Sequence, residues 1–147
     1  HFWMRADSAM ENADTFITKW MGNSSGPGYK VRYITGPDRV QVIVASSTGA
    51  VNPVFSTPAI LDNNWHHIAV NIDRDVPNGV NLYMDGVLMD CNSQCAYDLT
   101  GIDDTSNALP FGLGTRAADD PGNEFVGQLD DVRIYNRVLA TSTIQRL

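Results

Sequence analysis

Hydrophobic and polar residues alternate along most of the chain. Between Trp65 and Arg74, the apolar residues Ile68, Val70 and Ile72 occupy every second position. Side chains of a strand alternate between its two faces, so this spacing predicts a half-buried strand. Similar runs predict further strands, and the full set is Phe2–Ala6, Thr15–Trp20, Tyr29–Thr35, Arg39–Ser46, Val54–Ser56, Trp65–Arg74, Val80–Met84, Val87–Met89, Pro110–Gly114 and Phe125–Tyr135. Many short strands between turns indicate an all-β sandwich or barrel.

Local signals at two places add detail to this pattern. The dipeptide Asp85-Gly86 joins two predicted strands, and it suits a two-residue hairpin turn because both of its residues need positive φ. Near the end of the chain, residues 141–147 predict one helical turn with Thr141 or Ser142 as its N-cap. The sequence therefore predicts antiparallel strand pairing and almost no helix.

Three segments of the sequence resemble one family of domains. They are Trp65–Val70 (WHHIAV), Leu82–Gly86 (LYMDG) and Phe125–Leu139 (FVGQLDDVRIYNRVL). Together they resemble the laminin G-like, concanavalin A-like domains of secreted proteins, and the resemblance extends over residues 1–147. It implies an all-β fold, a two-sheet antiparallel jelly-roll sandwich in a single domain. A shared fold does not by itself imply one activity.

The start of the chain departs from this family pattern. Members of the family carry a further segment before the strand that contains Trp3, whereas this sequence starts within that strand. The resemblance therefore implies an N-terminally truncated domain that lacks one or more strands. An unpaired strand edge is open to association, so we expect a missing segment, another chain or another domain to cover it.

Composition narrows the classes of partner. A chain of 147 residues with 43% hydrophobic residues is long enough and apolar enough to bury one core. The net charge of −7 disfavours binding to the phosphate backbone of nucleic acid. The sequence has no apolar stretch of membrane-spanning length and no basic, then apolar leader. We therefore expect no membrane insertion, and any signal peptide to have been removed already.

The two cysteines, Cys91 and Cys95, allow two interpretations. A local disulfide would shape a tight loop and would indicate an oxidising compartment, such as the outside of the cell. A zinc site would need further thiolates or imidazoles, and the chain offers only three histidines. The disulfide is the favoured interpretation, with secretion or display at the cell surface as its consequence.

Catalytic patterns are absent from the sequence. Sugar-cleaving sandwiches use paired carboxylates, but the chain has only two glutamates, Glu11 and Glu124, and neither lies in a strand motif of such enzymes. His66 and His67 are adjacent on a predicted strand, so they point to opposite faces and cannot chelate one metal together. No Gly-x-Ser-x-Gly elbow presents a nucleophilic serine. We expect no enzymatic activity.

Acidic and amide residues gather in three predicted loops, at positions 62–64, 103–107 and 119–124. Calcium is bound by six to eight such oxygens, so these loops are candidates for a calcium site. The family resemblance implies Asp62 as one ligand and Asp104 or Asn107 as another. Asp130 is implied either in a structural bond to a neighbouring loop or as a ligand of a buried calcium. The alternative is that all these residues only cap turns.

A sugar ring binds to an exposed aromatic side chain while neighbouring polar groups recognise its hydroxyls. Tyr83 alternates with the apolar residues of its strand and is expected to face away from the core, while Tyr29 and Tyr97 lie in or beside polar loops. These tyrosines are the predicted ligand-binding residues. Trp3, Trp20 and Trp65 lie within or at the end of apolar runs, and we expect them to pack in the core or on a sheet.

The sequence is compatible with two functions of different classes. The first is a secreted, calcium-supported carbohydrate-binding module whose partner is a polysaccharide or glycan. The second is a structural or adhesion domain that contacts other extracellular protein domains without binding sugar. The family contains both kinds of domain, and the sequence favours the first only slightly.

Overall fold

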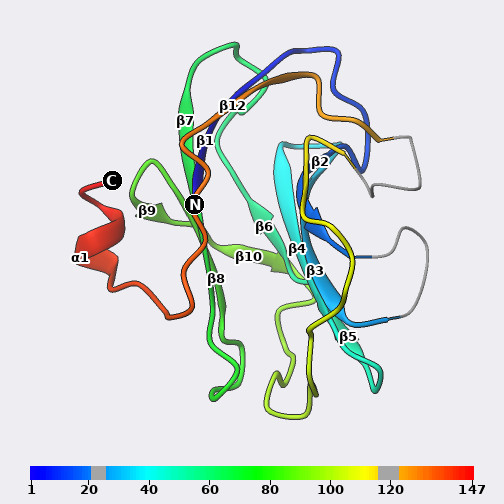
Figure 1. The fold of residues 1–147 in the computed structure, drawn as a ribbon. Coiled ribbons are helices and arrows are strands. Elements are labelled where there is room, and N and C mark those ends of the chain that lie inside the picture. The colour runs from blue at the N-terminus through cyan, green and yellow to red at the C-terminus, as the bar shows by residue number, and fades with distance from the viewer. Residues whose placement is uncertain (21–25, 116–122) are drawn as a thin grey trace.

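Two antiparallel sheets lie face to face in the computed structural model of the chain, which describes residues 1–20, 26–115 and 123–147 (Figure 1). One is a five-stranded sheet with the order β12-β1-β7-β8-β9. Its strands are β1 (Phe2–Ala6), β7 (His66–Ile72), β8 (Val80–Met84), β9 (Val87–Leu88) and β12 (Gly127–Asp130). Every strand pair in it is antiparallel.

The second sheet has seven strands in the order β10-β6-β4-β3-β2-β11, with β5 paired to β4. These strands are β2 (Thr15–Lys19), β3 (Gly28–Ile34), β4 (Arg39–Ala45), β5 (Ala50–Val51), β6 (Val54–Ser56), β10 (Cys91–Ser93) and β11 (Gly112–Leu113). The predicted two-sheet antiparallel sandwich is confirmed. The very short β5 and β10 were not predicted, because two or three residues give no readable alternation.

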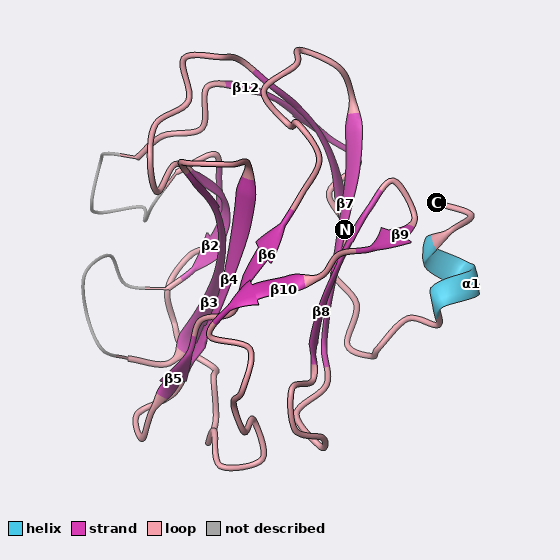
Figure 2. Ribbon diagram, turned by 180° about the vertical axis from the view of Figure 1, so that it is seen from behind, coloured by secondary structure: helices cyan, strands magenta, loops and turns pink. Residues whose placement is uncertain are grey.

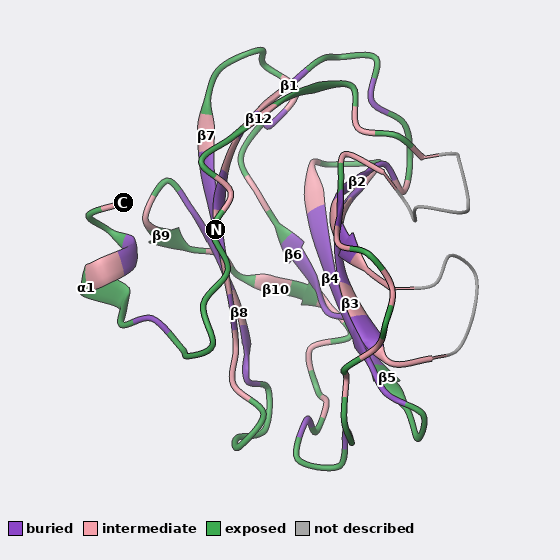
Figure 3. Cartoon of the chain, in the orientation of Figure 1, coloured by how far each residue is buried: buried purple, intermediate pink, exposed green. Residues whose placement is uncertain are grey.

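The core lies between the two sheets, and buried residues lie along strands of both of them (Figure 3). In β1 these are Phe2, Met4 and Ala6, which are fully buried, while Trp3 and Arg5 between them are only partly buried. The period of two therefore separates a core face from an outer face in the five-stranded sheet. The outer face carries the site described below.

The last predicted strand, Phe125–Tyr135, is shorter than expected. β12 ends at Asp130, because Asp131 has a φ of 47° and this left-handed conformation cannot continue a regular strand. Arg133 nevertheless exchanges two backbone hydrogen bonds of 2.8 Å with His1, so the chain still runs beside the start of β1. This short irregularity decides where Tyr135 lies.

The C-terminal segment folds back onto the outer face of the five-stranded sheet, where the helical turn α1 (Thr141–Ile144) lies beside β8 and β9 (Figure 2). Leu139 and Ile144 bury Ala69 and Tyr83 of the sheet in a small second cluster. The predicted helical turn is confirmed, but its predicted cap is wrong. The N-cap residue is Ala140, which offers no side-chain oxygen to the free backbone amides.

Two local predictions are confirmed by the backbone and the sulfur atoms. Asp85 and Gly86 have φ values of 51° and 78°, as a two-residue hairpin turn requires. Cys91 and Cys95 form a disulfide, with their Cα atoms 5.8 Å apart. In the described ranges, none of the helical structure is long and apolar enough to cross a membrane.

Candidate functional site

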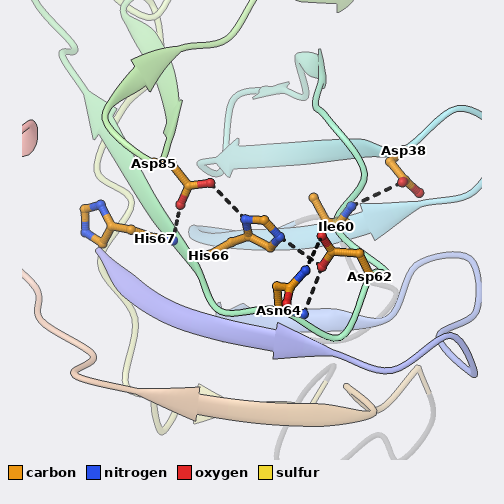
Figure 4. Close-up of polar contacts among 7 residues, drawn as sticks. All are labelled: Asp38, Ile60, Asp62, Asn64, His66, His67 and Asp85. Atoms are coloured by element: carbon orange, nitrogen blue, oxygen red, sulfur yellow. Dashed lines mark hydrogen bonds and ion pairs between the residues drawn. The ribbon is translucent and has the colours of Figure 1, made fainter.

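The beginning of β7 is held by a histidine between two aspartates, on the side of the strand that faces the other sheet (Figure 4). His66 Nδ1 lies 2.8 Å from Asp85 Oδ2, and His66 Nε2 lies 3.1 Å from Asp62 Oδ1. The second oxygen of Asp85 accepts the backbone N–H of His67 over 2.8 Å. We name Asp62, His66 and Asp85 the histidine clamp.

Both neighbours of the imidazole are carboxylates, which only accept hydrogen bonds, so both ring nitrogens must carry protons for the clamp to be complete. Burial lowers the pKa of His66, but the hydrogen bonds and charges of Asp85 and Asp62 outweigh it and raise the pKa above the ordinary value. Hydrogen bonds from Asn64 and then from His66 lower the pKa of Asp62 to about 2. The contacts of the clamp and the raised pKa of His66 thus both favour the protonated imidazolium between the two carboxylates.

This arrangement is a brace and not a proton-transfer site. It ties the loop before β7 and the turn between β8 and β9 to one imidazole. A general acid or base needs a ring nitrogen or a carboxylate oxygen free to reach a substrate. Neither nitrogen of His66 is free, and Asp62 is also bonded to the backbone and side chain of Asn64.

A row of aromatic rings lies on the opposite, outer face of the same strands. Trp65 is 41% exposed, and the guanidinium of Arg5 lies 5.9 Å from the centre of its ring. Trp3 lies on the same face of β1 as Arg5, and its ring centre is 5.3 Å from that of His67. The register explains this order, because Trp3 is paired with His67 across β1 and β7.

The row continues beyond β1 through two further rings. The ring of His1 lies 5.0 Å from that of His67, and His1 Nδ1 is 3.0 Å from His67 Nε2. Tyr135 stacks on His1 at 5.8 Å with an interplanar angle of 18°, and it is 38% exposed. We name Trp65, Trp3, His67, His1 and Tyr135 the aromatic strip.

Polar groups border the strip on its β12 side. Gln128 is paired with Arg5 and Asp130 with Trp3, so these side chains lie on the same face as the strip, and both are exposed. The exposed ring of Trp65, beside amide, carboxylate and guanidinium groups, has the chemistry that binds a sugar ring and recognises its hydroxyls. The strip is therefore the candidate functional site.

The four predicted calcium ligands do not come together. Asp62 lies in the loop just before β7. Asp104 lies near the other end of this strand, because the carbonyl of the preceding residue, Asp103, accepts a hydrogen bond from Arg74, which follows β7. Asn107 uses its amide to bind the carbonyls of Lys19 and Pro27 and its oxygen to accept the N–H of Leu109. Its side chain thus ties the end of β2 to the residue before β3.

Asp130 is exposed, and its carboxylate accepts the backbone N–H of Asp131 over 2.7 Å. Across the three described ranges, no group of three or more His, Cys, Asp or Glu side chains could hold a metal ion. Positions 119–122 of the third acidic loop lie outside the described residues. The residues that are described thus do not assemble the calcium site, and calcium binding stays a prediction.

The three predicted ligand-binding tyrosines do not lie on the strip. Tyr83 faces away from the core as expected, but the expectation that it is open to a ligand is wrong. It is only 6% exposed, because Leu139 and Ile144 cover it, and its hydroxyl lies 3.1 Å from that of Thr141. The pattern of β8 could not reveal this cover, which comes from the far end of the chain.

Tyr97 and Tyr29 have other surroundings. The hydroxyl of Tyr97 accepts the N–H of Val80 and donates to its carbonyl, so this ring fastens a loop to β8. Tyr29 is half-buried and lines a cavity between the two sheets, and burial raises the pKa of its hydroxyl. Neither ring forms an exposed platform.

The exposed rings of Trp65 and Tyr135 were not among the predicted ligand-binding residues. Trp65 was expected to pack in the core or on a sheet; it lies one residue before β7, opposite Arg5 on the outer face of the sheet, and is 41% exposed. The signal was present in β1, where Trp3 alternates with the core residues Phe2 and Met4 and must point outward. The position of Tyr135 depends on the end of the strand at Asp131, which no pattern in the sequence predicted.

Comparison with known families agrees with this sandwich. A family model of laminin G type, described as the concanavalin A-like lectin/glucanases superfamily, matches residues 1–145. The chain belongs to this family. A search among curated proteins found no match. Membership places the domain among lectin-like and adhesion modules, within a superfamily that also contains glucanases.

Proposed function

We propose that this laminin G-type domain is a non-catalytic carbohydrate-binding module that binds a glycan along the aromatic strip. The observation that carries the proposal is the exposure of Trp65, with the guanidinium of Arg5 over its ring and the exposed Gln128 and Asp130 alongside. An exposed tryptophan in a row of rings gives a flat apolar surface for sugar rings. The bordering polar groups offer both donors and acceptors to sugar hydroxyls.

The rigidity of the strip supports this proposal. The clamp fixes the loop that leads into Trp65, since Asp62 and His66 hold its two ends and Asn64 is bonded to Asp62. A preformed surface loses less conformational entropy on binding than a mobile one. The histidine clamp and the aromatic strip thus occupy opposite faces of the same strand with complementary roles, one holding the backbone and one contacting the ligand.

Two further elements of the proposal rest on chemistry and family membership. Disulfides such as the one between Cys91 and Cys95 form and persist in oxidising compartments, so we propose that the domain works outside the cell. The two carboxylates that flank His66 support a binding role, since Asp62 and Asp85 both bond to the imidazole and do not face one another across an open cleft, as the two carboxylates of a glycosidase do.

A glycan array tests the proposal, run with the protein and with Trp65→Ala, each with and without a calcium chelator. Trp65→Ala is expected to weaken binding about tenfold, since one stacked ring contributes on the order of 1.4 kcal/mol. Trp20→Phe is the matched control, because Trp20 lies away from the strip, with its indole N–H bonded to the carbonyl of Gly26.

Each outcome of the array decides one point. Binding lost in Trp65→Ala and kept in Trp20→Phe supports the strip as the site. Binding that the chelator removes supports calcium, and binding that it leaves unchanged contradicts the calcium prediction. Absence of glycan binding in every arm contradicts the carbohydrate proposal and leaves the alternative, an adhesion domain that binds extracellular protein.

A further inference from the structure

A row of outward side chains crosses the strands of the five-stranded sheet at the exposed end of the aromatic strip. Arg5 of β1 is paired with Gln128 of β12 on one side and lies opposite Trp65, which precedes β7, on the other. We name Trp65, Arg5 and Gln128 the transverse row. Neighbouring strands are about 4.8 Å apart, so the row is about 10 Å long, which is close to the length of two sugar residues in a linear glycan.

The transverse row is more open than the row beside it. Trp65 is 41% exposed, and Gln128 is exposed on β12, the outermost strand on its side of the described sheet. In the neighbouring row, Trp3 is only partly buried, but His67, with which it is paired, is 3% exposed. A sugar ring needs an open aromatic face for stacking, so the transverse row is the accessible one.

The path along β7 is closed to a ligand that starts on Trp65. The next two outward positions of this strand are His67 and Ala69, which are 3% and 2% exposed. Ala69 lies beneath Leu139 and Ile144 of the C-terminal segment. A glycan chain that stacks on Trp65 can therefore continue over the sheet only across the strands, towards β12.

Arg5 lies in the middle of this path and has unused hydrogen-bonding capacity. Arg32 and Arg39 are also partly buried, and they donate to a glutamine side chain and to a backbone carbonyl. Arg5 makes no hydrogen bond or ion pair to any described residue, and its recorded contact is with the ring of Trp65. Its guanidinium carries five N–H donors, which can therefore bind the hydroxyls of a ligand.

We propose that the transverse row is a two-sugar binding site, in which a linear, extended glycan lies across the strands with one pyranose on Trp65 and the next over Arg5 and Gln128. This inference rests on the proposed glycan function and specifies the direction and length of the bound segment. The indole takes the apolar face of the first sugar, and the guanidinium donates to hydroxyls of the second. Gln128 determines specificity there, because its amide offers an acceptor as well as donors.

Calorimetric titration with fragments of increasing length tests the two-sugar site. The probes are the mono-, di- and trisaccharide of the linear glycan that binds most tightly on the array. The disaccharide is expected to bind about tenfold more tightly than the monosaccharide, since it adds hydrogen bonds to Arg5 and Gln128. The trisaccharide should gain no more than about twofold over the disaccharide, because the row ends at the outermost strand β12.

Substitution of Gln128 separates the two sugars. Gln128→Ala is expected to lower the affinity for the disaccharide about fivefold and to leave the affinity for the monosaccharide unchanged. Trp65→Ala should lower both affinities, since the first sugar stacks on its ring. Gln145→Ala is the matched control and should change neither affinity, because Gln145 is an exposed glutamine at the end of α1, over the covered part of the sheet.

The outcomes separate this inference from the proposed function. A loss in Gln128→Ala that is confined to the disaccharide supports the two-sugar site. Equal losses for both fragments overturn it, and so does a trisaccharide that gains as much over the disaccharide as the disaccharide gains over the monosaccharide. Binding that depends on Trp65 but not on Gln128 overturns this inference and keeps the proposed function. Absence of glycan binding on the array contradicts both.

Discussion

The outer face of the five-stranded sheet has two halves, of which one is covered by the C-terminal segment and the other is open to solvent. Over β8 and the middle of β7, the C-terminal segment buries Tyr83 and Ala69 beneath Leu139 and Ile144. Over β1 and the start of β7, the rings of the aromatic strip include the solvent-exposed Trp65. Both halves carry aromatic residues at outward positions of regular strands.

The difference shows that alternation along a strand tells which face a side chain takes, but not whether that face is covered. Tyr83 and Trp3 both point outward, yet only Tyr83 is covered by a segment from the end of the chain. Asn71 secures this cover, because its side chain donates to the carbonyl of Leu139 and accepts the N–H of the same residue. The covered half should therefore contribute stability and the open half binding.

The largest expected effect comes from removing the cover. Ile144→Ala empties the small cluster over Tyr83, and we expect it to lower the free energy of unfolding by about 3 kcal/mol. Urea denaturation measures this loss. Ser142→Ala, at an exposed position of the same turn, should change it by less than about 0.5 kcal/mol. Equal effects of the two substitutions would show that the segment does not pack as described.

Next in size is the bond that secures the covering segment. Asn71→Ala leaves the backbone N–H and C=O of Leu139 without their partners, so we expect a loss of about 2 kcal/mol. Asn81→Ala is the matched control, since Asn81 is paired with Asn71 across β7 and β8 but is only partly buried. If both substitutions cost the same free energy, the bonds to Leu139 do not hold the cover.

In the open half, a substitution should weaken glycan binding much more than it lowers the stability of the fold. Trp65→Ala is expected to lower the free energy of unfolding by less than about 1 kcal/mol, since the ring is largely in solvent, while glycan binding falls about tenfold. Thermal unfolding and a binding isotherm on the same preparation compare the two effects. A loss of stability as large as that of Ile144→Ala would place Trp65 in a structural role.

The smallest expected effects concern pH and the two adjacent histidines. Burial lowers the pKa of His67, whereas the aspartates of the clamp raise the pKa of His66. His66 therefore stabilises the fold below its unfolded pKa near 6.5, and this contribution is lost as pH rises through its higher folded pKa. His67 stabilises the fold above 6.5 and loses this contribution as pH falls through its lower folded pKa.

A pH titration of the imidazole signals by NMR measures both values, with His66→Gln and His67→Gln used to assign them. His66 should titrate above 6.5 and His67 below it. If the two rings titrate together near the ordinary value, the clamp does not hold an imidazolium in solution. The reversed order would contradict the assignment of the two faces.

Much of the fold was predictable because strand alternation and turn chemistry are local. The strand at Val80–Met84, the turn at Asp85-Gly86 and the disulfide at Cys91 and Cys95 all followed from a few neighbouring residues. The end of β12 was not predictable, since only the backbone conformation of Asp131 stops it. Local signals thus predicted which strands and turns form, but not where every strand ends.

The candidate site was far less predictable because it depends on contacts between distant segments. Asp62 was identified as a functional candidate, but its partners His66 and Asp85 come together only in the folded hairpin. Trp65 lies opposite Arg5 on the outer face, although the strands β2 to β6 separate the two residues along the chain. Tyr83 was lost as a candidate for the same reason, through the C-terminal cover.

If the open half of the outer face binds glycan, the three indole N–H signals of the chain should report the binding. A glycan selected from the array is titrated into ¹⁵N-labelled protein while these signals are followed. The signals of Trp65 and Trp3 should shift in a saturable manner while that of Trp20 stays unchanged. A shift of the Trp20 signal alone, or binding that moves neither Trp65 nor Trp3, would contradict the account.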